Sequence, residues 1–427
     1  MIGYLSLFSL ALLPAASGAS PLETLRAENV LAFEITAPEP KPDILGTCPR
    51  SKAINQTASD PNEASSLKGV TEVEPEMLPL PEDDLEKESL LNALATTLTY
   101  WKKRPNTFTI IVGKDTYTAV QMRATTQKLI DLLSADMTTE ELHTALKTQF
   151  RVYRSVAEDN SGKIILTGYY EAEVPASRQQ DSVYKFPIYI KPPDLVKVPA
   201  ALGMDFDYGR KDENGNLLRY YSRQEISSGV LTGKGLELVW TAHPSQIMLL
   251  QIQGSGILRF PDGDFIKTGF DGANGWPFKS VQKILLDCGE IPDMSFKDFI
   301  GYLSTQGARE SLLVDLNPRY VFFKSLPKDT PAYGAMGRAL TPGRSIAVDP
   351  APLPLGITAL IKAKKPVAGP AGGLSFKDFS RFVTAQDTGS AIRGPGRIDL
   401  FWGAGAVAET EASSMKTKGD LFVLIAK

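Results

Sequence analysis

The stretch that most constrains the fold of this 427-residue chain lies near its C-terminus, at residues 383–405. There, Asp387 and Asp399 bracket a loop rich in glycine and proline, and strand-like patterns lie on either side of it. Glycines permit backbone turns and the close approach of a ligand. Phe401 and Trp402 follow directly, and their flat apolar faces can hold a sugar ring or fill a core. A tight hairpin whose aspartates cap turns is the plainer interpretation of the same residues.

Hydrophobic periodicity divides the rest of the chain into a helical part and a strand-rich part. Leucines at helical spacing predict helices over 88–103 and 117–135. Thr138 and Glu141 predict a capping box at the start of a third helix, 140–149. Beyond it, strand patterns alternate with Gly and Pro-Asp-Gly turns. The expected strands are 164–166, 184–190, 236–240, 247–252, 257–260 and 320–323, and the expected helical region is 280–316.

Composition and motifs exclude several classes of function. A formal net charge of −3 gives no basic face for nucleic acid, so we expect no nucleic-acid partner. The two histidines, His143 and His243, lie on a predicted helix and before a proline turn, so they do not suggest a metal site. The chain has neither a phosphate-binding loop nor a complete dinucleotide fingerprint, and it has no Gly-x-Ser-x-Gly elbow. We therefore expect no metal and no cofactor.

The sequence of the N-terminal part indicates a leader followed by a linker. Residues 1–19 resemble a secretory signal peptide, since an apolar run precedes a small-residue cleavage site. A membrane anchor is the alternative, but the apolar run is too short to span comfortably. Residues 20–88 are rich in Pro, Ser and acidic side chains, which predicts a solvated, partly disordered arm. Because Cys48 lies in this arm, we expect Cys48 and Cys288 to be unpaired thiols rather than a disulfide, although an oxidising compartment would permit one.

Six stretches in the same order resemble the membrane-bound lytic murein transglycosylase A family, and together they cover roughly residues 150–427. The stretches are LTGYYEAEVPAS (166–177), YYSRQEISSGVLTGKGLELVW (220–240), LLQIQGSGILRFPDG (249–263), NPRYVFFK (317–324), LTPGRSIAVD (340–349) and AQDTGSAIRGPGRIDLFWGAG (385–405). An ordered set of this kind is far more specific than one short motif.

The resemblance implies a mainly β fold with flanking helices. A double-psi β-barrel would form from 89–174 and 327–427. A smaller β-domain, 175–326, would be inserted between those segments, with a glycan groove between the two domains.

The resemblance also implies cleavage of the β-1,4 bond between N-acetylmuramic acid and N-acetylglucosamine in peptidoglycan, with 1,6-anhydro ends. Asp399 matches the family's single catalytic acid/base, and Asp387 matches a second signature aspartate expected to order the loop. One carboxyl suffices because the sugar's own C6 hydroxyl attacks C1, so no second carboxylate has to activate water. We expect Phe401 and Trp402 to form an apolar wall that raises the pKa of Asp399.

The remaining expected site residues would contact the glycan. The QIQGSG motif is expected at a strand end facing the groove, and a β-bulge with ordinary turn glycines is its alternative. The tyrosines that follow Gly168 could stack sugars or belong to the core. The expected substrate-binding residues are Tyr169, Tyr170, Gln251, Gln253, Gly254, Ser255, Gly256, Asn274, Arg393, Phe401 and Trp402.

The expected partner is the peptidoglycan glycan strand, and a cell-wall synthesis complex is a further expected partner. We expect the protein to be a monomer in the periplasm. Well-described family members carry a lipid-bearing cysteine near residue 20, but the first cysteine here is Cys48, so we do not expect a lipid anchor. Two alternatives stay open. One is a peptidoglycan-binding protein without turnover, and the other is a hydrolase on the same barrel.

Overall fold

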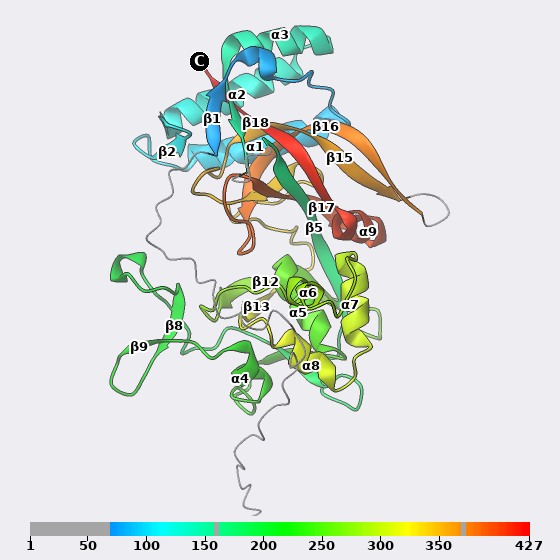
Figure 1. Cartoon of the computed structure of the whole chain (residues 1–427). Helices are drawn as coiled ribbons and strands as arrows, with labels where there is room; N and C mark the ends of the chain where they lie inside the picture. Colours follow the sequence, from blue (N-terminus) through cyan, green and yellow to red (C-terminus); the bar gives the residue numbers. More distant parts are fainter. Residues whose placement is uncertain (1–68, 158–161, 369–372) are drawn as a thin grey trace, which may run out of the picture. The chain divides into compact units, whose positions relative to one another are not determined.

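The chain folds around a closed barrel of six strands (Figure 1). The computed structural model describes residues 69–157, 162–368 and 373–427. In order around the barrel, the strands are β18 (Lys416–Ala426), β15 (Thr358–Ala368), β16 (Leu374–Thr388), β14 (Ser345–Val348), β17 (Arg397–Ala404) and β5 (Ile164–Pro175), and β5 pairs back with β18. The β14–β16 and β17–β5 pairs are parallel, and the other pairs are antiparallel. This mixed closed sheet confirms the expected barrel class.

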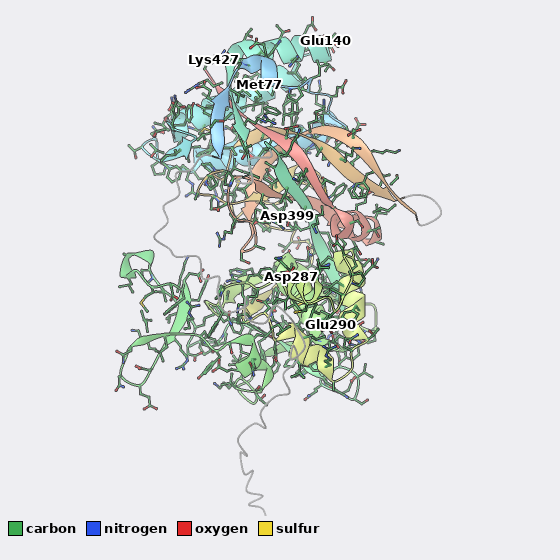
Figure 2. The ribbon with its side chains drawn as sticks, in the orientation of Figure 1. Met77, Glu140, Asp287, Glu290, Asp399 and Lys427 are labelled. Atoms are coloured by element: carbon green, nitrogen blue, oxygen red, sulfur yellow. The ribbon has the colours of Figure 1, made fainter. Side chains whose placement is uncertain are left out.

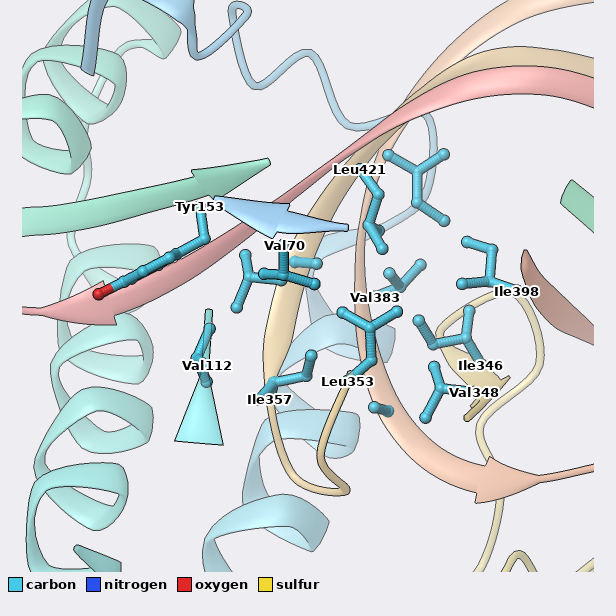
Figure 3. Packing of buried hydrophobic residues seen from close by; sticks show 14 of the residues in the cluster. Val70, Val112, Tyr153, Ile346, Val348, Leu353, Ile357, Val383, Ile398 and Leu421 are labelled. Atoms are coloured by element: carbon cyan, nitrogen blue, oxygen red, sulfur yellow. The ribbon is translucent and has the colours of Figure 1, made fainter. Parts of the chain in front are cut away.

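The barrel interior is a dense apolar core (Figure 3). Ile346, Val383, Ile398 and Leu421 come from four different strands, and each is completely buried. Along each of these strands, side chains point alternately into the barrel and away from it, because a strand has a period of two residues. The residues between them point outward, and the candidate site is built on that outer face.

Three helices lie where the sequence predicts them, and they cover part of the barrel: α1 (Lys87–Lys102), α2 (Ala119–Ser134) and α3 (Thr139–Gln149). Their buried leucines pack against β4 (Phe150–Ser155) and the outward residues of β15, β16 and β18. The predicted capping box is present, since the Thr138 side chain accepts from the Glu141 amide and the Glu141 carboxylate accepts from the Thr138 amide. A short hairpin of β2 (Thr109–Val112) and β3 (Asp115–Thr118), which the sequence analysis missed, joins α1 and α2.

The predicted disordered arm is wrong for its last part. Strand β1 (Val70–Val73) pairs with β4, and a single turn, η2 (Pro75–Met77), follows it. Farther along, Asp83 pairs with Arg344 at 2.5 Å and Asp84 pairs with Arg381 at 2.7 Å. Both arginines are almost completely buried, so they need these carboxylates as counter-charges. The acidic run that resembled a linker therefore neutralises the barrel's buried cations.

Strand β5 also connects the barrel to a second group of elements, because its last residues pair with β11 (Ser255–Arg259). Next to β11 lie β12 (Phe265–Ala273) and β13 (Val321–Leu326), which extend the same sheet. The remaining elements are β6 (Phe186–Tyr189), β7 (Val196–Lys197), η3 (Ala200–Leu202), β8 (Tyr208–Lys211), β9 (Leu217–Arg219), α4 (Arg223–Ser227), β10 (Glu237–Thr241), α5 (Pro244–Gln253), α6 (Val281–Asp287), α7 (Phe296–Ser304), α8 (Arg309–Val314) and α9 (Ala406–Ser414).

One predicted strand, 247–252, is wrong because these residues belong to helix α5. A continuous apolar run fits a buried helix as well as a buried strand, since it has no face to distinguish them. The residues at the start of this segment favour a helix over a strand. Pro244 occupies its first turn, and the Glu310 carboxylate accepts hydrogen bonds from the Ser245 amide at 3.0 Å and hydroxyl at 2.5 Å.

The expectation of unpaired thiols is also wrong, because Cys288 is disulfide-bonded. Cys48, the chain's other cysteine, lies outside the described residues, as do the expected signal peptide and most of the expected arm. Within the described ranges, no helix is both long and apolar enough to cross a bilayer.

Candidate active site

Four residues on neighbouring strands line up across the outer face of the barrel. Ala347 on β14 pairs with Asp387 on β16 on one side and with Asp399 on β17 on the other. Asp399 pairs in turn with Thr167 on β5. Because directly paired residues share a face, both carboxylates and the threonine hydroxyl project from the same surface. A β-bulge next to Ala347 sets this register, and bulges commonly re-aim side chains beside functional sites.

Asp399 is a partly buried carboxyl at the third residue of β17 (Figure 2). Burial raises its pKa to about 6, because desolvation disfavours the charged form. The nearby charge of Asp387 also raises this pKa, while the Thr167 hydroxyl and the positive Arg397 lower it. The Thr167 hydroxyl donates a hydrogen bond to Oδ1 of Asp399 at 2.9 Å. A carboxyl with a pKa of about 6 exchanges a proton readily near neutral pH.

The apolar wall expected beside Asp399 stays a prediction, and the structure places its two rings in different clusters. Phe401 lies two residues along β17, on the same face, and its ring centroid is 5.2 Å from that of Tyr169. Both rings belong to a small buried cluster with Ala347 and Ile392. Trp402 faces the other way and packs against the two large cores, with its ring close over Gly168. Phe401 therefore contributes to the surroundings of Asp399, and Trp402 contributes to the framework.

Asp387 is engaged by three donors. Its Oδ1 accepts hydrogen bonds from the amides of Ala335 at 2.9 Å and Thr388 at 2.8 Å, and its Oδ2 accepts one from the Tyr169 hydroxyl at 2.9 Å. Burial raises the pKa of Asp387, and these hydrogen bonds oppose that rise. The carboxylate thus joins β5, β16 and the segment around Ala335.

The QIQGSG motif lies at the end of helix α5 rather than at the expected strand end. Gln251 is buried, and its amide donates to the Val321 carbonyl at 2.9 Å while its oxygen accepts from Arg223. Gln253 accepts a hydrogen bond from the Tyr170 amide at 3.0 Å. Gly254 ends the helix with a φ of 81°, a conformation that glycine adopts without strain.

The last two residues of the motif begin strand β11. A Cβ at Gly256 would lie 2.5 Å from the Ala172 carbonyl oxygen, so close strand packing requires this glycine. Ser255 is partly exposed. The motif's glycines thus serve a cap and a strand contact, and its glutamines hold neighbouring backbone.

The structure gives framework contacts to three more of the expected glycan-binding residues. Asn274 is completely buried, and its amide donates to the Tyr221 and Pro318 carbonyls at 2.9 and 2.8 Å. Tyr169 and Tyr170 are buried as well, which favours the core alternative for both rings. Arg393, in contrast, is exposed on the loop before β17.

Sequence reasoning missed Thr167, Ala347 and Ala335. Thr167 is in the LTGYY stretch, two residues before Tyr169, and this strand spacing places both on one face. Nothing in the sequence indicates that Ala347 lies between the aspartates, because that follows from strand order. Within the described ranges, no three His, Cys, Asp or Glu side chains are gathered as metal ligands.

Comparisons with known proteins agree with the fold. Residues 165–324 match the MltA specific insert domain, and residues 344–425 match the 3D domain. Membrane-bound lytic murein transglycosylase A of Vibrio cholerae is 30% identical over 270 residues, which are 62% of this chain and 66% of the relative. The Escherichia coli K12 protein of the same name is 30% identical over 271 residues, which are 62% of this chain and 67% of that relative.

The chain belongs to the membrane-bound lytic murein transglycosylase A family.

Solved structures of this family share the fold. The membrane-bound lytic murein transglycosylase of Agrobacterium tumefaciens superposes with a TM-score of 0.68 and 28% identity, over 84% of this chain and 98% of the other. E. coli MltA with bound chitohexaose superposes with a TM-score of 0.64 and 22% identity, over 84% of this chain and 95% of the other. The sequence relatives align over about two thirds of their own length, and the structures over nearly all of theirs.

Proposed function

We propose that this chain is a lytic transglycosylase that cleaves the β-1,4 bond after N-acetylmuramic acid in peptidoglycan, with Asp399 as its single acid/base. The observation that carries the proposal is the raised pKa of a partly exposed carboxyl on the barrel's outer face. Membership of the family supports the reaction class, and the chitohexaose bound to the E. coli neighbour supports a glycan as the ligand.

In the proposed reaction, protonated Asp399 donates its proton to the glycosidic oxygen, and the bond from that oxygen to C1 breaks. The C6 hydroxyl of the same muramic acid attacks C1 and forms the 1,6-anhydro ring. Its proton passes to the Asp399 carboxylate, which restores the acid. No water is consumed, and holding the attacking hydroxyl in the same sugar replaces the activation of water by a second carboxylate.

The neighbouring carboxylates support a single acid/base over a hydrolase. Asp387 lies two strands away, about 10 Å at the backbone, and three hydrogen bonds occupy it. Glu171 is four residues beyond Thr167 on β5, roughly 13 Å along the strand. It forms an ion pair with Lys267 at 3.0 Å. A hydrolase needs its second carboxyl free to attack carbon or to activate water, whereas Asp387 and Glu171 are both engaged by other groups of the protein.

Mass spectrometry of purified glycan strands after incubation tests this proposal. Fragments with anhydro ends are the expected result. Reducing ends would identify a hydrolase, and intact strands would favour a binding protein without turnover.

We further propose that the protein is exported and acts in the periplasm, where its substrate lies. The signal-peptide-like residues 1–19 and the relatives' description as membrane-bound support export. Cell fractionation tests the compartment. Recovery in the periplasmic fraction is expected, and retention in the membrane after a high-salt wash would contradict a mature chain without a lipid anchor.

A further inference from the structure

A short hairpin, Ala332–Leu340, is clamped beside the two aspartates. Its ends are joined by a hydrogen bond of 2.8 Å from the Leu340 amide to the Ala332 carbonyl, and Tyr333 pairs with Ala339. Ala332 and Leu340 are buried in the same cluster as Phe401 and Tyr169. The base of the hairpin is therefore part of the apolar layer that covers the outer face of the barrel around Asp399.

The tip of the hairpin is held against β16. The Ala335 amide donates to Oδ1 of Asp387 at 2.9 Å, and the Met336 amide donates to the Gln386 carbonyl at 3.2 Å. At Gly334, a Cβ would lie 2.4 Å from that same carbonyl oxygen, so the close approach requires glycine. With both base and tip fixed, the hairpin is a rigid support rather than a free loop.

Two side chains of this hairpin, those of Tyr333 and Arg338, are available to contact a ligand. Tyr333 is 51% exposed, although both the base and the tip of the hairpin that carries it are fixed. Arg338 donates to the neighbouring Gly337 carbonyl at 3.1 Å, and no carboxylate in the described part of the chain pairs with it. Its Nε is buried without an acceptor there. The hairpin thus offers an apolar ring and an uncompensated positive charge.

Both side chains lie within reach of a glycan bound at Asp399. The hairpin tip contacts Asp387, which is two strands, or about 10 Å, from Asp399. Tyr333 and Arg338 are two and three residues from Ala335, which adds at most about 11 Å of chain. A strand of several sugars extending from the cleaved bond covers such a distance.

We propose that the hairpin Ala332–Leu340 is a substrate subsite for sugars that carry stem peptides, an inference that rests on the proposed function. The Tyr333 ring stacks against the apolar face of a sugar, and the Arg338 guanidinium pairs with a carboxylate of the peptide attached to muramic acid. Charge-assisted hydrogen bonds of this kind are among the strong ones available to a protein surface. A glycan stripped by an amidase keeps only the lactyl carboxylate of muramic acid, so comparing the two substrates asks whether Arg338 prefers a carboxylate of the peptide to the lactyl one.

The test compares peptide-bearing peptidoglycan strands with strands stripped of peptides by an amidase. The variants are Tyr333→Ala and Arg338→Gln. Phe376→Ala, a 48% exposed ring on β16 eleven residues from Asp387, and Arg104→Gln, an exposed arginine after α1, are the matched controls. We measure kcat/KM on both substrates, together with co-sedimentation with insoluble peptidoglycan.

Arg338→Gln is expected to lower the ratio of kcat/KM on peptide-bearing strands to that on stripped strands by about tenfold. Tyr333→Ala is expected to raise KM on both substrates and to weaken co-sedimentation, while neither control changes the ratio. An unchanged ratio in Arg338→Gln, or unchanged KM in Tyr333→Ala, would overturn the subsite. If the wild type releases no anhydro ends, the proposed function is wrong. Co-sedimentation of the two variants then still shows whether the hairpin binds peptidoglycan.

Discussion

The Thr167 hydroxyl donates a hydrogen bond of 2.9 Å to Oδ1 of Asp399, across the parallel pair of β5 and β17. This bond favours the charged form of a carboxyl whose pKa burial has raised to about 6. The two effects oppose each other, and their balance places the pKa of Asp399 where both proton donation and proton acceptance are accessible.

Thr167→Val removes the bond while keeping the shape of the side chain. The pKa of Asp399 should then rise by about one unit, because the carboxylate loses a donor. In the proposed mechanism protonated Asp399 acts first, so kcat/KM of the wild type falls as pH rises past about 6. In Thr167→Val this fall should move to higher pH. Thr116→Val, at an exposed position of β3, is the control and should keep the wild-type profile. A Thr167→Val profile that coincides with the wild-type and control profiles would contradict the role of this bond.

Asp399→Asn should change stability in a pH-dependent way. The folded-state pKa of Asp399 is raised, so its contribution to stability is fully present below the unfolded value of 3.8 and is lost as pH rises through about 6. Asparagine does not ionise, and therefore the variant should be more stable than the wild type at pH 7.5, by at most about 3 kcal/mol. The difference should shrink to near zero at pH 4. Thermal unfolding at both pH values measures it, and a variant less stable at pH 7.5 would disprove the linkage.

Asp387→Ala should destabilise the fold by about 2–4 kcal/mol, because it leaves the Ala335 and Thr388 amides and the Tyr169 hydroxyl without their acceptor. Tyr169→Phe removes only one of these bonds and should cost about 1 kcal/mol. Urea unfolding of both variants gives the comparison. Equal stability of Asp387→Ala and the wild type would mean that this carboxylate does not order the loop.

Asp83→Ala should destabilise the protein by about 3–5 kcal/mol, since it leaves the positive charge of Arg344 buried without its partner. The Arg344 side chain is 0% exposed. The matched control is Asp271→Ala, which breaks a pair at 3.6 Å with the exposed Lys324 and should cost no more than about 1 kcal/mol. Similar losses in the two variants would show that residues before α1 are not integral to the barrel.

The sequence predicts those parts of the fold that depend on local periodicity. Leucine spacing predicts α1 and α2, and the Thr138–Glu141 capping box predicts the start of α3, because those signals lie within a few residues. The run 247–252 is misassigned because an apolar run has no periodicity to separate helix from strand, and a distant residue, Glu310, caps the helix.

The candidate site is predictable only in part for the same reason. Asp387 and Asp399 stand out within one short stretch, but their placement on either side of Ala347 follows from a bulge and from the order of strands. The roles of Asp83 and Asp84 depend on buried arginines some 260 to 300 residues away, so composition alone suggested a linker. Similarly, the side chains of Gln251, Gln253 and Asn274, which are expected to contact the glycan, form hydrogen bonds with backbone groups that are distant in the sequence.

The most direct test is the turnover of Asp399→Asn and Asp387→Asn on purified glycan strands, with a melting curve for each variant. Asparagine at 399 keeps the shape of the side chain but can neither deliver a proton to the leaving oxygen nor accept one from the C6 hydroxyl. Asp399→Asn is expected to stay folded and to lose about a hundred- to ten-thousand-fold in rate, near the upper end of that range, while Asp387→Asn retains much more activity. A stable but inactive Asp387→Asn beside an active Asp399→Asn would contradict this expectation.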